Sequence, residues 1–298
     1  MADPGRRHRA NAPGPWFVDT TCIDCDASAQ CAPWMFDHVD AQAVVVRQPA
    51  TPEEERDAAR ALLACPTGSI GTTGRLPAVA DLYPHHLGDT ALGSGVFYCG
   101  YNSADSYGAN AYFVRRPGGN LLVDAPRWVR PLARKLEDAG GLAHVLLTHR
   151  DDVADAERYA AHFGARVWIH EADRDAAPYA TDTFAGRDPT APARGVLAVP
   201  LPGHTRGSMA YLVDDEALFS GDSLYFSRGL GRLSAFSGAT WYSWKEQAAS
   251  LERLAAHAFA WVLPGHGDRR RADAATMRRQ LLDLVARMRR DRDGEGEW

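Results

Sequence analysis

Residues 195–208, GVLAVPLPGHTRGS, form an apolar run that is typical of a buried β-strand and that ends in Gly203 and His204. The glycine permits a tight turn, so the histidine would project from the end of the strand. A single histidine after a strand is more often an ordinary core or surface residue than a metal ligand. The run indicates a functional site only if other strands of the chain end in the same way.

Three further apolar runs do end in a potential metal ligand. They are HVLLTH, which ends at His149, EALFSGD, which ends at Asp222, and FAWVLPGH, which ends at His266. Strand ends at one edge of a layered α/β fold are where ligands and catalytic groups gather. Because imidazole and carboxylate groups suit zinc, iron or manganese, the four runs together predict one cleft that binds metal ions.

Helical patterns lie between these strand-like runs. Apolar residues recur at helical spacing in PRWVRPLARKLEDAG, DAERYAAHFG and YSWKEQAASLERLAAHA. Residues 107–127 read as two alternating strands joined by a turn at residues 117–120, Pro-Gly-Gly-Asn. Strands interleaved with helices predict a layered α/β architecture.

The motifs GHTRGS, FSGDS and LPGHG resemble those of the metallo-β-lactamase superfamily in order and in separation. The resemblance covers roughly residues 95–270. It implies an αββα sandwich, which we expect over residues 85–298, with one or two zinc or iron ions at one edge.

The same resemblance implies a set of ligands. His149 and His204 would bind the first metal ion, and Asp222 would bridge the ions or complete the first site. His266 would serve the second ion, and we expect either Asp151 or Asp152 to bind that ion with it.

Residues 148–155, THRDDVAD, depart from the family pattern His-x-His-x-Asp-His, in which only His149 has a secure counterpart. Asp151 is the best candidate for the family's aspartate and is a candidate metal ligand. Asp151 and Asp152 are also candidate catalytic residues that would orient a bound water or move its proton. We expect Asp155 to cap the helix that follows.

Four of the five cysteines lie in the first quarter of the chain, namely Cys22, Cys25, Cys31 and Cys65. The stretches FVDTTCIDCDASAQCAPWMFD and ALLACPTGSI resemble a small bacterial-type ferredoxin, with a proline directly after the last cysteine. The resemblance implies a small α+β ferredoxin-like domain over residues 17–75 that binds a [4Fe-4S] or [3Fe-4S] cluster. A zinc site and the absence of any metal are the alternatives.

The ferredoxin pattern places a third cysteine at position 28, where this chain has Ser28. Cys31 lies about one helical turn later and is our candidate substitute, with Cys22, Cys25 and Cys65 as the other ligands. Alternatively, Cys25, Cys31 and Cys65 bind a three-iron cluster, or a Ser28 oxygen or no protein group completes the cluster.

Composition limits the class of protein. The 298 residues carry a net charge of −5, which argues against a nucleic-acid partner, and their apolar runs are shorter than the roughly 20 residues of a membrane-spanning helix. Residues 1–16 contain no apolar segment typical of a secretion signal, and we expect a disordered leader there. The sequence thus predicts a cytoplasmic protein that acts on a small-molecule substrate and has no membrane partner. A protein that exchanges electrons with the cluster is a further candidate partner.

Two chemistries remain open. The favoured one is hydrolysis of a small ester, thioester, lactone or amide by metal-bound hydroxide. The alternative is a non-haem iron oxidoreductase, because two histidines and one carboxylate suit iron(II) and a ferredoxin-like domain could deliver electrons. A non-catalytic redox or iron sensor is a third alternative. The aromatic residues Trp241, Tyr242 and Trp244 are expected to form a core cluster at a helix start rather than to line the pocket.

Overall fold

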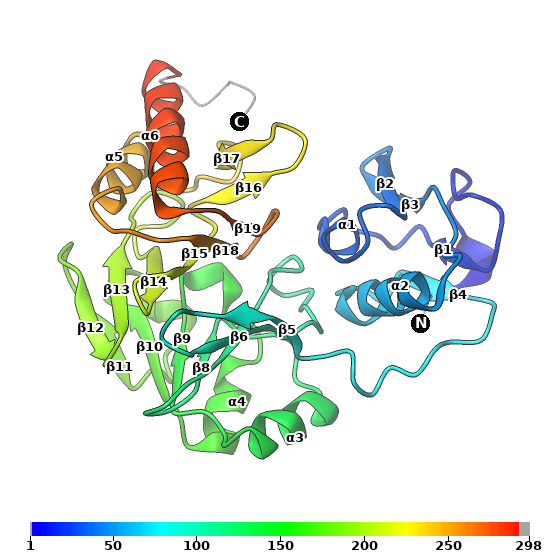
Figure 1. The fold of residues 1–298 in the computed structure, drawn as a ribbon, viewed down its shortest axis with the longest axis horizontal. Helices are drawn as coiled ribbons and strands as arrows, with labels where there is room; N and C mark the ends of the chain where they lie inside the picture. The colour runs from blue at the N-terminus through cyan, green and yellow to red at the C-terminus, as the bar shows by residue number, and fades with distance from the viewer. Residues whose placement is uncertain (1, 292–298) are drawn as a thin grey trace.

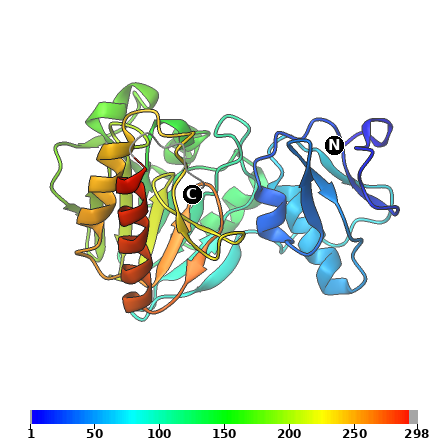
Figure 2. The same cartoon turned by 90° about the horizontal axis from the view of Figure 1, so that it is seen from above.

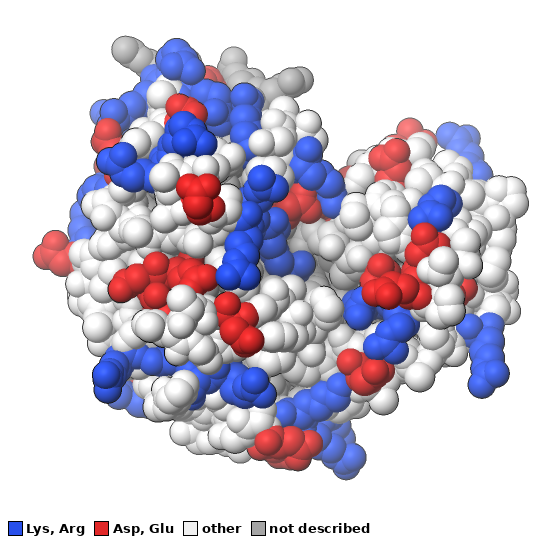
Figure 3. All heavy atoms as spheres, in the orientation of Figure 1, with Lys and Arg blue, Asp and Glu red and all other residues white. Residues whose placement is uncertain are grey.

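The computed structural model describes residues 2–291. A smaller N-terminal unit, residues 2–72, lies beside a larger sandwich unit, residues 85–291, as Figures 1 and 2 show. Figure 3 shows that acidic and basic side chains are interspersed on one face of the molecule, which is hollowed between the two units.

The sandwich unit contains two mixed β-sheets. The strands of the seven-stranded sheet are, in spatial order, β11 (Asp182–Phe184), β10 (Arg166–His170), β9 (His144–Leu146), β8 (Leu121–Val123), β7 (Tyr112–Arg115), β6 (Gly95–Tyr98) and β5 (His85–Asp89). The strands of the six-stranded sheet are β12 (Thr190–Ala193), β13 (Val196–Pro200), β14 (Met209–Val213), β15 (Ala217–Gly221), β18 (Trp261–Pro264) and β19 (Arg270–Arg271). A separate hairpin consists of β16 (Tyr225–Ser227) and β17 (Arg232–Ser234).

Helices cover the outer face of each sheet (Figure 1). α3 (Arg130–Asp138) and α4 (Ala156–Phe163) share a buried apolar cluster with the first sheet, and α5 (Trp244–Leu254) and α6 (Ala274–Arg290) share one with the second. A third apolar cluster fills the space between the sheets. The layers therefore run helix, sheet, sheet, helix, which confirms the predicted αββα sandwich.

The N-terminal unit has the small α+β character that was predicted. Its strands and helices are β1 (Trp16–Val18), α1 (Ala27–Cys31), β2 (Phe36–Val39), β3 (Gln42–Val45), α2 (Pro52–Ala64) and β4 (Ile70–Thr72). β1 pairs with β4, and β2 pairs with β3, both antiparallel. α2 begins where the Thr51 side chain accepts a hydrogen bond from the backbone N–H of Glu54.

The expectation of a disordered leader over residues 1–16 is not met in its described part. A short 3₁₀ turn forms at Pro4–Arg6, and the Arg7 guanidinium donates to the carbonyl oxygens of Gly14 and Trp16 at 2.8 and 3.2 Å. The side-chain Oδ1 of Asn11 also accepts a hydrogen bond from the backbone N–H of Val18 at 3.1 Å. Polar side chains thus form hydrogen bonds with the backbone groups of a segment that has little regular secondary structure. The composition of the segment does not reveal these hydrogen bonds.

The two units share contacts near the cysteines. The Arg127 guanidinium donates to the carbonyl oxygens of Leu63, Cys65 and Pro66 at 3.1, 3.3 and 3.4 Å. The buried apolar cluster between the sheets also continues into the N-terminal unit. Within residues 2–291, no helix is both long and apolar enough to cross a bilayer.

Candidate metal centre

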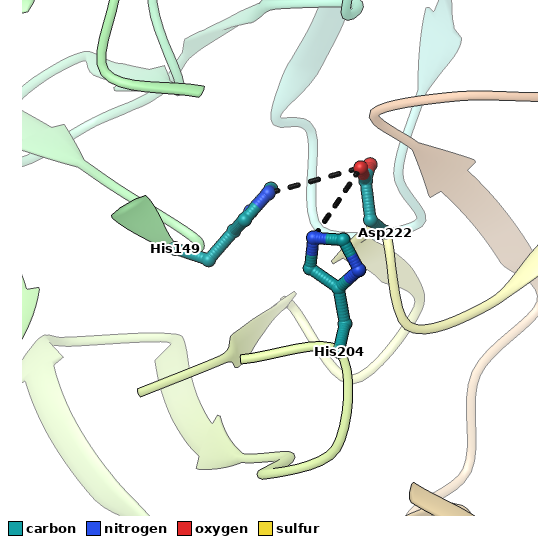
Figure 4. Close-up of side chains that lie close together, drawn as sticks. All are labelled: His149, His204 and Asp222. Atoms are coloured by element: carbon teal, nitrogen blue, oxygen red, sulfur yellow. Dashed lines mark ion pairs between the residues drawn. The ribbon is translucent and has the colours of Figure 1, made fainter. Parts of the chain in front are cut away.

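The four strand-end residues do meet at one edge of the sandwich. His149 follows β9, His204 follows β13, Asp222 directly follows β15, and His266 follows β18. Figure 4 shows the imidazoles of His149 and His204 directed toward the carboxylate of Asp222.

His149, His204 and Asp222 form a first group of potential ligands, which we call group one. Asp222 Oδ2 lies 3.7 Å from His149 Nε2 and 3.8 Å from His204 Nε2. Asp151 Oδ2 lies 3.8 Å from His149 Nε2 and 3.3 Å from His204 Nε2. A tetrahedral ion with ligands at about 2.0–2.1 Å sets neighbouring ligand atoms roughly 3.3 Å apart, so these atoms can surround one ion.

Asp152, Asp222 and His266 form a second group, group two, which shares Asp222 with the first. His266 Nε2 lies 3.9 Å from Asp222 Oδ2. The sequence paired His266 with either Asp151 or Asp152. The structure brings Asp152 to His266 and keeps Asp151 beside His149 and His204.

The polar atoms of these groups fit a cation. Four of them are buried without a hydrogen-bond partner in the described chain: His149 Nε2, His204 Nε2, Asp152 Oδ2 and Asp222 Oδ1. Each such atom costs about 1–3 kcal/mol if nothing compensates it. Metal ions would bind all four, and the donors are imidazole and carboxylate, which suit zinc or iron.

Burial also sets the protonation of these groups. It lowers the pKa of His149 to about 4, so the ring is neutral near neutral pH and can offer a lone pair to a metal. Burial and the neighbouring carboxylates of Asp222 and Asp124 raise the pKa of Asp152. A bound cation would oppose that effect by favouring the carboxylate.

Asp124 and Thr148 orient the His149 ring. Thr148 Oγ1 donates to Asp124 Oδ2 at 2.9 Å and therefore accepts from His149 Nδ1, also at 2.9 Å, which leaves Nε2 free for a metal. Burial raises the pKa of Asp124 to about 8, and a cation beside His149 would favour its ionised form. Asp124 was missed in the sequence, although LLVD, like the four runs above, is an apolar strand that ends in a polar residue.

Asp155 does not act as the sequence predicted. It occupies the N-cap position of α4, but its side chain makes no capping hydrogen bond. Its carboxylate instead accepts from the backbone N–H of Trp128 at 2.6 Å, which ties α4 to the segment before α3.

A cavity of about 820 Å³ opens onto both ligand groups and is lined by Asp151, Asp152, His204, Asp222 and His266 among others. Trp241 also lines it, and 69% of its surface is exposed. The expectation that Trp241 belongs to a core cluster is therefore wrong. The segment that precedes α5 runs along the cavity, so Trp241 lines the cavity. The N-terminal unit contributes Asp24, Cys25 and Asp26 to the same cavity.

Three of the four predicted cluster ligands surround a second, smaller cavity. Its lining includes Cys22, Cys25 and Cys65, together with Ser28. Backbone N–H groups point at two of the sulfurs, from Ala43 to Cys22 Sγ at 3.4 Å and from Ser69 to Cys65 Sγ at 3.2 Å. Thiols that converge with N–H donors on one small space fit an iron–sulfur cluster.

Cys31 does not line that cavity. Its Sγ lies 3.4 Å from the Tyr83 hydroxyl, on another side of α1. A step of three residues leaves two helical side chains about 60° apart around the axis and about 4.5 Å apart along it. In α1 this offset is enough for Ser28 to line the cavity while Cys31 packs against Tyr83. The prediction that Cys31 replaces the missing cysteine is not supported by this placement, because Ser28 and not Cys31 lines the cavity with the other three cysteines.

Comparisons with known proteins agree with both units. A family model described as the 4Fe-4S single cluster domain of Ferredoxin I matches residues 18–72, and one described as the Metallo-beta-lactamase superfamily matches residues 95–281. The chain is 37% identical over 157 residues to a hydroxyacylglutathione hydrolase of Acidiphilium cryptum (strain JF-5), a match that covers 51% of this chain and 60% of the relative. It is 33% identical over 178 residues to a hydroxyacylglutathione hydrolase of Rhizobium meliloti (strain 1021), covering 56% of this chain and 62% of the relative.

The matches thus span less than two thirds of the length of these two relatives. Among solved structures, ETHE1 from Myxococcus xanthus aligns with a TM-score of 0.47 and 19% identity, over 64% of this chain and 85% of that one. The second family model alone covers more than half of the 298 residues. The chain therefore belongs to the metallo-β-lactamase superfamily and carries an N-terminal ferredoxin-like unit.

Proposed function

We propose that this protein is a metal-dependent hydrolase that cleaves a small ester, thioester, lactone or amide. The observation that carries the proposal is the pair of ligand groups that share Asp222 at one cavity. Two relatives are named for the hydrolysis of a hydroxyacylglutathione, an acyl thioester, and this supports hydrolysis over redox chemistry.

In this proposal the ligand groups bind one or two zinc or iron ions. When bound, such ions polarise a carbonyl oxygen and lower the pKa of a bound water. His149 is held in the ligand tautomer by Thr148. Asp152 is buried and belongs to group two with His266, so we assign it to metal binding rather than to proton transfer.

Asp151 is our candidate general base. Its side chain is 45% exposed and lines the cavity, where it can meet a substrate-side proton. The imidazole of His204, 3.3 Å away, holds the pKa of the Asp151 carboxyl below its usual value, so the group is ionised near neutral pH. An ionised carboxylate at this position can accept a proton from the attacking water.

The experiment compares two carboxylate variants of the metal-loaded protein. Asp151→Asn should lower kcat for release of a thiol from an acyl thioester by about a hundredfold, the usual contribution of a general base. Asp155→Asn is the control, because the Asp155 carboxylate accepts a hydrogen bond from Trp128 outside the cavity. This variant should change kcat by less than about twofold. The proposal fails if no ester, thioester, lactone or amide is hydrolysed, and the base assignment fails if Asp151→Asn retains full kcat.

A second candidate function is a non-haem iron oxidoreductase that receives electrons from the N-terminal cluster and from an electron-carrier partner. One observation favours it. A Cβ placed on Gly108 would lie 2.8 Å from Cys25 Sγ, and the ring of the adjacent Tyr107 lies 6.3 Å from that of His266. Only a short loop therefore separates a predicted cluster ligand from group two.

Cluster removal separates the two candidates. Hydrolysis that survives loss of the cluster, with zinc in the sandwich unit, supports the hydrolase. Turnover that requires oxygen or a reductant, and that stops when iron is replaced by zinc, supports the oxidoreductase.

A further inference from the structure

We infer that the cavity selects an uncharged or cationic substrate over an anionic one, and that the N-terminal unit contributes to this selection through Asp24 and Asp26. The inference rests on the proposed hydrolytic function and names the substrate class for it. It also assigns the fused ferredoxin-like unit a role at the cavity that does not depend on electron transfer.

The outer part of the cavity is rich in carboxylates. Beyond the residues of the two ligand groups and Asp151, its lining includes four acidic residues and one arginine: Asp24, Asp26, Asp105, Asp268 and Arg228. A further cation, His38, lies behind the loop, with Nδ1 2.5 Å from Asp24 and Nε2 3.4 Å from Asp26. The hydrogen bond to Asp26 helps to raise the pKa of His38 to about 9, so it is charged near neutral pH. In this outer part of the cavity, away from the two ligand groups, four carboxylates still outnumber the two cationic side chains.

The cations are already engaged. Arg228 lies 2.5 Å from Asp26 and 3.2 Å from Asp268, and it also donates to the carbonyl oxygen of Ala29 at 2.8 Å. A substrate anion would have to compete with two carboxylates for this guanidinium. Asp105, in contrast, is exposed, and no ion pair involves it in the described chain. Its charge therefore faces the cavity without a neutralising partner.

The rest of the outer lining is aromatic. Tyr225 and Phe236 stack at 4.1 Å, while Tyr107 and Trp241 are 57% and 69% exposed. An apolar substrate can pack against the exposed aromatic surface of a cavity, and the faces of aromatic rings also attract cations. Carboxylates beside aromatic rings suit an uncharged or cationic group and repel an anionic one.

The N-terminal loop is held against the cavity from two sides. The Tyr107 hydroxyl donates to the carbonyl oxygen of Ile23, and Arg228 binds Asp26. The loop therefore presents Asp24 and Asp26 from a fixed position. An acyl-glutathione bears two carboxylates and one ammonium group and is therefore a net anion, so we do not expect this substrate to suit the cavity.

The test uses three thioesters with the same acetyl group and different thiols. Acetylthiocholine is cationic, S-acetyl-N-acetylcysteamine is neutral, and S-acetylglutathione carries two carboxylates. At low ionic strength, kcat/KM for the first two should exceed that for the third by about tenfold, and the ratio should shrink as salt screens the charges. An equal or higher kcat/KM for S-acetylglutathione would overturn the inference and leave the hydrolase proposal intact.

Charge variants locate the source of the preference. Asp105→Lys should reduce the cationic-to-anionic ratio of kcat/KM by about three- to tenfold, and Asp24→Asn by about twofold, with cluster iron and sulfide unchanged. Asp188→Lys changes the net charge as Asp105→Lys does, but it lies outside the cavity lining and should leave the ratio unchanged. Equal effects of the two lysine variants would show that only net charge matters and would refute the inference.

A binding measurement keeps the two proposals apart. Choline and glutathione can be titrated while the fluorescence of Trp241 is followed, with Trp241→Phe as the blank. If no thioester is hydrolysed but choline binds more tightly than glutathione, the substrate preference stands and the hydrolase proposal falls. If glutathione binds as tightly as choline, the inference is wrong regardless of turnover.

Discussion

Thr148→Val tests how the fold prepares His149 for a metal. The substitution keeps the β-branched shape but removes the hydroxyl that joins Asp124 to His149 Nδ1 at 2.9 Å on each side. Loss of a partner that orients a ligand histidine typically lowers metal affinity ten- to hundredfold, which is about 1.4–2.7 kcal/mol. The free energy of unfolding should also fall by about 2–4 kcal/mol, because two buried polar groups lose a partner.

The assay is zinc affinity by competition with a chelator, together with the thermal unfolding midpoint. Thr90→Val is the matched control, since Thr90 is also buried and its hydroxyl donates to a carboxylate, that of Asp214, at 2.6 Å. This control should lose stability without losing zinc affinity. Thr148→Ser keeps a hydroxyl and should retain most of the affinity. Wild-type affinity in Thr148→Val, or an equal loss in Thr90→Val, would refute the orientation argument.

Three further predictions concern the cluster, the two metal ions and pH. Ser28→Cys should slow the loss of cluster iron in air, whereas Cys31→Ser should leave iron content and lifetime as in the wild type; the reverse would restore Cys31 as a ligand. His204→Ala should abolish tight zinc binding, whereas His266→Ala should retain one ion, because group one has two imidazoles and group two has one, and metal analysis of the two variants checks this. His38 has a pKa raised from 6.5 to about 9, so its stabilisation is complete below pH 6.5 and is lost as pH rises through about 9. The difference in unfolding midpoint between wild type and His38→Gln should accordingly be larger at pH 6 than at pH 10, and a difference independent of pH would contradict it.

The sequence was sufficient to predict the sandwich and the meeting of four strand ends. Apolar runs that end in His149, His204, Asp222 and His266 carry this information, because strand ends of one sheet edge are neighbours in any layered α/β fold. The partner of His266 could not be chosen, because Asp151 and Asp152 are adjacent and the direction of each side chain depends on the local 3₁₀ turn, Arg150–Asp152.

Other features of the two sites could not be predicted from the sequence, because they depend on the orientation of a helix or on packing between the two units. Cys31 was favoured by its distance along the chain, but the orientation of α1 directs Ser28 to the cluster cavity. The approach of Asp24 and Asp26 to the metal cavity results from packing between units far apart in sequence, for which no local pattern exists. Trp241 was assigned to the core because aromatic residues beside the start of a helix often pack in the core. Whether such a residue is buried depends on the three-dimensional structure and cannot be read from the local sequence.

Anomalous diffraction from crystals of the zinc-loaded protein, recorded at the zinc absorption edge, tests the shared-carboxylate centre most directly. We predict two peaks on either side of Asp222. The stronger should lie among His149, His204 and Asp222, and the weaker among Asp152, Asp222 and His266. The absence of a peak at both groups, or a single strong peak that Asp222 does not contact, would contradict the proposed centre.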